Sequence, residues 1–155
     1  MLKAKGRRTA GKPSWRSFMD EFSAIQDVSL MEGVVAGCAV VAYADGWVTE
    51  EEKKRMAGLI HGFTPMRAFG ITEVMHAFEE TTRRFEADHD EGELHALSVV
   101  GALRGRERYP ELLVQTCCAI AAADGGFDAE ERAAASRVCQ ALGLDPAEFD
   151  LADAR

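Results

Sequence analysis

Apolar residues recur at the three- and four-residue spacing of amphipathic helices along most of the chain, and the alternation typical of strands is missing from the sequence. The pattern predicts helices over residues 17–27, 31–44, 49–62, 72–88, 93–103, 110–123 and 128–142. A capping signature at 145–148 predicts one further short helix. The acidic stretch 88–93 is expected to be a solvated loop. We therefore predict an all-α fold, a single-domain bundle of about seven helices.

One segment occurs twice. Residues 35–52 return as 114–131 with a constant offset of 79. Each copy is a small, apolar helix that ends at Ala-Asp-Gly, followed by an N-cap residue, Thr49 or Asp128, and a glutamate three positions later, Glu52 or Glu131. This spacing is a capping box that starts a second helix. We predict two helical hairpins related by an approximate two-fold operation. We name their turns the first corner (residues 43–52) and the second corner (residues 122–131).

Composition and charge narrow the class of protein. The chain has 155 residues, 47% of them hydrophobic but only 8% aromatic, which is enough for one core packed from small aliphatic side chains. Residues 1–16 carry six basic side chains and no apolar stretch, so we expect a disordered basic tail there and a folded domain over 17–155. Without that tail, 12 positive charges face 26 negative ones. Such a body should repel nucleic acid and attract cations or basic partners.

Location and redox state follow from the same composition. The longest apolar run is too short to span a bilayer, which needs about 20 residues. We predict no transmembrane segment and a cytoplasmic protein. Four cysteines in a chain of this length need no disulfides, and their spacing matches no zinc pattern.

Each corner resembles the second half of an EF-hand calcium loop. The candidate metal ligands are Asp45, Thr49 and Glu52 in the first corner, and Asp124, Asp128 and Glu131 in the second. The two leading carboxylates of a calcium loop are missing, so only weak binding of Ca²⁺, Mg²⁺ or Mn²⁺ is expected unless the two corners pair. The alternative is purely structural, because turn and capping roles account for all six residues without an ion. Both hypotheses stay open at this point.

The sequence offers little chemistry for catalysis. No serine or cysteine nucleophile can be assigned a histidine partner from its spacing, and the glycines follow predicted helices instead of the strands that precede phosphate loops. We therefore expect a protein that is not an enzyme.

The two aligned corners and the terminal motif Ala-Leu-Gly-Leu-Asp-Pro-Ala-Glu-Phe (141–149) resemble the tellurite-resistance TerB family from about Met31 onward. The resemblance implies an all-α bundle with internal pseudo-symmetry, a cytoplasmic role in resistance to tellurite and related stresses, membrane-associated protein partners and acidic metal ligands. It brings no catalysed reaction. The chain departs from the family pattern at Trp47 and at Thr49, which leaves the first corner one carboxylate poorer. The alternative function is a metal-independent helical adaptor, similar to the TerB-like domains of co-chaperones and membrane complexes.

Overall fold

The computed structural model of the protein describes residues 27–62, 66 and 68–151, and these residues form helices and no strand. The elements are α2 (Val28–Ala42), α3 (Glu50–Gly62), α4 (Ile71–Ala87), α5 (His89–Gly101), α6 (Tyr109–Ala123), α7 (Ala129–Ala141) and the short 3₁₀ helix η3 (Pro146–Phe149). The predicted all-α class is confirmed, with six α-helices in the described part of the chain where about seven were expected. The predicted tail and nearly all of the predicted helix over 17–27 lie outside the described residues. None of the described helices is long and apolar enough to cross a membrane.

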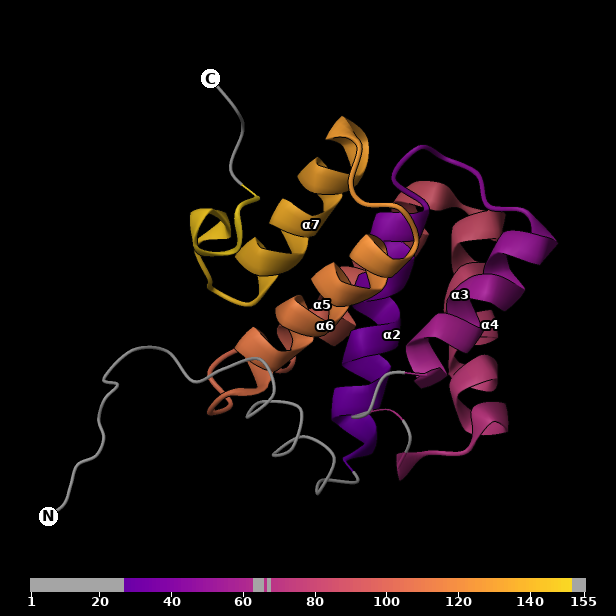
Figure 1. The fold of residues 1–155 in the computed structure, drawn as a ribbon, viewed down its shortest axis with the longest axis horizontal. Coiled ribbons are helices and arrows are strands. Elements are labelled where there is room, and N and C mark those ends of the chain that lie inside the picture. Colours follow the sequence, from indigo (N-terminus) through magenta and orange to yellow (C-terminus); the bar gives the residue numbers. More distant parts are fainter. Residues whose placement is uncertain (1–26, 63–65, 67, 152–155) are drawn as a thin grey trace, which may run out of the picture.

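Helix α2 is the centre of the bundle. It packs against α4, α5, α6 and α7, and Figure 1 shows it between the α3–α4 pair and the α6–α7 pair. Almost every side chain from Leu30 to Val41 is buried, because this stretch has one charged residue and many small ones. A Cβ atom on Gly37 would lie only 3.0 Å from the Cys117 sulfur, so glycine allows α6 to approach closely. The small residues of the repeated segment therefore serve close helix packing.

The acidic stretch 88–93 is helical from His89 onward, and the prediction of a loop there was wrong. Asp88 ends α4 and also caps α5, since its carboxylate accepts a hydrogen bond from the Glu91 N–H group at 3.2 Å. Gly92 faces α4, where an added Cβ would lie 2.6 Å from the Phe85 Cα atom. A single capping residue and one glycine thus join two tightly packed helices in a stretch whose charges alone suggested a loop.

Of the helices in the two sequence copies, α3 and α7 begin and end at equivalent positions. The bounds of α3 and α7 differ by the same offset of 79 residues that relates the two sequence copies, whereas α6 starts and ends two residues later than that offset would place it. The two-fold relation of the whole hairpins stays a prediction.

Candidate functional site at the paired acidic corners

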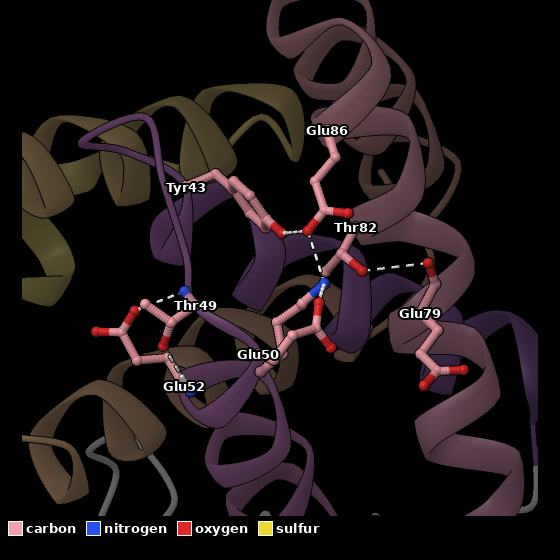
Figure 2. Close-up of polar contacts among 8 residues, drawn as sticks. Tyr43, Thr49, Glu50, Glu52, Glu79, Thr82 and Glu86 are labelled. Atoms are coloured by element: carbon pink, nitrogen blue, oxygen red, sulfur yellow. Dashed lines mark hydrogen bonds and ion pairs between the residues drawn. The ribbon is translucent and has the colours of Figure 1, made fainter.

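The first corner begins where α2 ends. The backbone turns through Gly46 at φ +98°, the left-handed conformation that glycine adopts without strain. The predicted capping box follows, because the Glu52 N–H group donates to the Thr49 hydroxyl at 3.1 Å and the Thr49 N–H group donates to Glu52 Oε1 at 2.8 Å. Figure 2 shows each of these two side chains next to the backbone nitrogen of the other residue. Thr49 and Glu52 thus fill the structural roles predicted for them.

Tyr43 holds the first corner against α4. The residue is 2% exposed, and its ring stacks on Phe85 with a centroid distance of 4.7 Å. Its hydroxyl donates to Glu86 Oε2 at 2.9 Å, and Lys53 Nζ donates to the same oxygen at 2.6 Å (Figure 2). The His89 ring nitrogen Nε2 lies 2.8 Å from the Tyr43 carbonyl oxygen. These contacts hold Tyr43, the first residue of the corner, against α4 and the start of α5.

Glu86 is the acceptor shared by this network. Burial alone would raise its pKa, but the hydrogen bonds from Lys53 and Tyr43 outweigh burial and lower the pKa below its usual value. Lys53 also forms an ion pair with Glu50 on its own helix. The ionised form of Glu86 is therefore part of the folded structure.

The second corner repeats this backbone design. Gly125 has φ +115°, and α7 starts with a capping box in which the Glu131 N–H group donates to Asp128 Oδ1 at 2.7 Å. The Asp128 N–H group donates in return to Glu131 Oε1 at 3.0 Å. Asp128 and Glu131 therefore cap α7 as Thr49 and Glu52 cap α3.

The two corners meet. Arg55, in the second turn of α3, donates from Nε to Asp124 Oδ1 at 3.0 Å and so links the first hairpin to the end of α6. A pocket of about 80 Å³ lies at this junction. Its carboxylates come from both corners: Asp45, Glu52, Asp124 and Glu131. Thr49 and Asp128 lie outside the lining. The structure thus brings together four of the six predicted ligands, and Trp47, which is 70% exposed, also lines the pocket.

The two capping glutamates have opposite electrostatics. Hydrogen bonds from the Thr49 backbone and side chain, helped by the charge of Arg55, lower the pKa of Glu52. Burial raises the pKa of Glu131, and the neighbouring charges of Asp128, Asp45 and Asp124 raise it further. Burial, and then crowding by other carboxylates, therefore destabilise the ionised form of Glu131, whereas the ionised form of Glu52 is stabilised.

Three of these acidic residues already have protein partners for one carboxylate oxygen. In the described part of the chain, no three Cys, His, Asp or Glu side chains are placed to hold one ion together. The capping glutamates each use one oxygen to accept a backbone hydrogen bond, and Asp124 uses one for Arg55. The guanidinium of Arg55 supplies the positive charge that a cation would bring. A divalent ion bound to Asp124 would compete with Arg55 for this carboxylate.

Sequence reasoning missed Arg55, although a signal for it exists. The second copy of the repeat has Ala134 at the equivalent position, so an arginine there is a difference between the copies that could have been noticed. Its partner could not have been named, because Asp124 lies 69 residues away. The Tyr43–Glu86 bond spans 43 residues and was missed for the same reason.

Comparisons with known proteins agree with the resemblance seen in the sequence. The family model described as tellurite resistance protein TerB matches residues 31–154. A curated protein from Alcaligenes sp, named tellurium resistance protein TerB, is 26% identical over 113 residues, which are 73% of this chain and 90% of that protein. No solved structure matches the chain.

Proposed function

Because the chain belongs to the TerB family, we propose that it acts in tellurite resistance or a related stress response as a cytoplasmic binding protein and not as an enzyme. The family match over residues 31–154 carries this proposal. The corner geometry supports a binding role, since the carboxylates there are fixed by capping and by Arg55 and none has a nucleophile or a histidine beside it in the described part of the pocket.

The binding surface is the corner face, which we define as Asp45, Trp47, Glu52, Asp124 and Glu131. An exposed indole beside several carboxylates suits a partner segment that carries arginine or lysine, which can pair with the carboxylates and lie over the ring. The net charge of −8 favours such a basic protein partner over nucleic acid. Membrane-associated components of tellurite resistance are the partners we propose, in line with the family.

A growth assay tests this surface. In a strain that lacks its own copy of the gene, the chain should restore tolerance to tellurite, and Trp47→Ala should lose most of that tolerance. Leu94→Ala is the matched control, because Leu94 is 72% exposed on α5 and is not part of the corner face. Equal tolerance with wild type and Trp47→Ala at equal protein levels would contradict the proposed surface.

Divalent-cation binding is the second candidate, favoured by the four carboxylates that share one pocket. Calorimetric titration with Ca²⁺, Mg²⁺ and Mn²⁺ should then show stronger binding by Arg55→Gln and weaker binding by Asp124→Asn than by wild type. A free cation concentration of about 100 times the dissociation constant should add about 2.7 kcal/mol to the free energy of unfolding. If all three proteins give the same isotherms as buffer, the metal-independent adaptor is the function that remains.

A further inference from the structure

Two buried thiols meet where α2 crosses α6. The Cys38 sulfur lies 3.7 Å from the Cys117 sulfur and donates its S–H group to it. Cys117 in turn faces the Val34 carbonyl oxygen, with a sulfur–oxygen distance of 3.9 Å. Both thiols are free, and their positions in the chain are equivalent in the two copies of the repeat. The packing of the two repeated helices thus places one cysteine of each copy against the other.

The two sulfurs lie close to the distance at which a disulfide bond forms. A disulfide has a sulfur–sulfur distance of about 2.05 Å, so the two sulfurs must approach by about 1.7 Å. Gly37 precedes Cys38 and lacks a side chain, and its missing Cβ would lie 3.0 Å from the Cys117 sulfur. The helices are therefore close enough here for a modest change in side-chain torsion to join the sulfurs.

We propose that Cys38 and Cys117 are a modification site, at which a hydroperoxide converts the two thiols into an intramolecular disulfide. One sulfur loses its proton and attacks a peroxide oxygen, the O–O bond breaks, and a sulfenic acid and water result when the peroxide is H₂O₂. The second thiol then attacks the sulfenic sulfur, the S–S bond forms, and the oxygen leaves as a second water. Both thiols are oxidised and one peroxide is reduced.

Burial makes the reaction slow and selective. Cys38 is 3% exposed and Cys117 is 7% exposed. The hydrogen bond from Cys38 and burial both raise the pKa of Cys117, so the reactive thiolate is scarce until the helices open locally. Once formed, the disulfide would join the two helices that end at the two corners, since Cys38 lies one turn before the end of α2 and Cys117 lies on α6.

The test is peptide mapping of the full chain after exposure to H₂O₂. The protein is denatured, free thiols are alkylated, and fragments are compared with and without dithiothreitol. We expect a fragment that links Cys38 to Cys117 and that separates on reduction. The Cys118→Ala, Cys139→Ala double variant should form the same link, because neither of these thiols takes part.

The Cys38→Ala variant should leave Cys117 open to alkylation, and its far-UV circular dichroism shows whether it folds. If it does not fold, the wild type and the double variant still decide. Full alkylation of both cysteines after oxidation would overturn the proposal. A link between Cys118 and Cys139 in place of the expected one would also overturn it.

Discussion

Replacing Tyr43 by phenylalanine removes one hydroxyl group from the network that holds the first corner. The stacked contact with Phe85, at 4.7 Å between centroids, does not need the hydroxyl and should persist. What is lost is the hydrogen bond of 2.9 Å to the carboxylate of Glu86. Tyr43→Phe therefore isolates the contribution of the hydroxyl group to stability, because the ring packing is kept.

The size of the stability loss depends on the contacts that Glu86 retains in the Tyr43→Phe variant. A hydrogen bond to a charged acceptor contributes about 1.5–3 kcal/mol. The Glu86 side chain is 37% exposed and retains Lys53 at 2.6 Å, so water screens the loss and no buried charge is left without a partner. We expect the free energy of unfolding to fall by about 1 kcal/mol, and the melting temperature by about 3 °C.

Lowering the pH should remove the difference in stability between Tyr43→Phe and wild type. The pKa of Glu86 is lowered in the folded protein, so the stability it adds is complete above its ordinary value of 4.5 and is lost as the pH falls through the lower, folded value. Tyr43→Phe weakens one of the bonds that lower this pKa. The gap between variant and wild type is therefore largest at neutral pH and shrinks once Glu86 is protonated.

Urea unfolding at neutral and acidic pH measures this gap, with an unchanged dependence on urea concentration as evidence that both proteins unfold the same structure. Glu86→Gln and the double variant complete the cycle, and the two substitutions should be far from additive. A variant as stable as wild type at neutral pH would refute the reasoning. So would a penalty that stays the same when Glu86 is glutamine.

Two matched pairs of substitutions test other parts of the structure. Gly92→Ala should destabilise by more than about 2 kcal/mol in thermal melts, because the new Cβ would lie 2.6 Å from Phe85 backbone atoms, whereas Gly58→Ala, with open space around it, should stabilise by about 0.5–1 kcal/mol. If both behave alike, the close approach of α4 and α5 is misjudged. Glu131→Gln should raise the melting temperature at neutral pH by removing a crowded charge, while Glu52→Gln should lower it by removing a stabilised one. The opposite order would contradict the electrostatics of the corners.

Local signals in the sequence were enough for most of the described helices and for the caps of α3 and α7. The start of α7 was predicted at Asp128 and lies at Ala129, directly after that cap, because a capping box is a contact between residues three apart. The stretch that begins at Asp88 was wrongly predicted as a loop, since its charge density hides the first turn of α5, where the buried residue is Gly92. Local sequence patterns predict caps and turns, but they do not predict that a glycine such as Gly92 packs against another helix.

Local signals identified the four carboxylates of the pocket but not the contact that joins the two corners. The pairing of the two corners was considered only as a condition for a stronger ion site, and the side chain that links them is a cation, Arg55. The two copies of the repeat share a left-handed glycine and a capping box, yet the surroundings give Glu52 and Glu131 opposite pKa shifts. Equivalent sequence therefore fixes equivalent local structure, while long-range contacts decide the electrostatics.

Arg55 makes the two candidate functions compete for the same place. A basic side chain of a partner and a divalent cation would each take the carboxylate that Arg55 now holds, at 3.0 Å from Asp124. Arg55→Gln should then strengthen the binding of either one, and millimolar Ca²⁺ or Mn²⁺ should weaken partner binding only if the ion occupies the pocket itself. Monovalent salt at equal ionic strength is the control, because screening lowers the attraction of all exposed charges alike. If Ca²⁺ or Mn²⁺ weakens partner binding no more than that control, the corner face binds its partner without an ion.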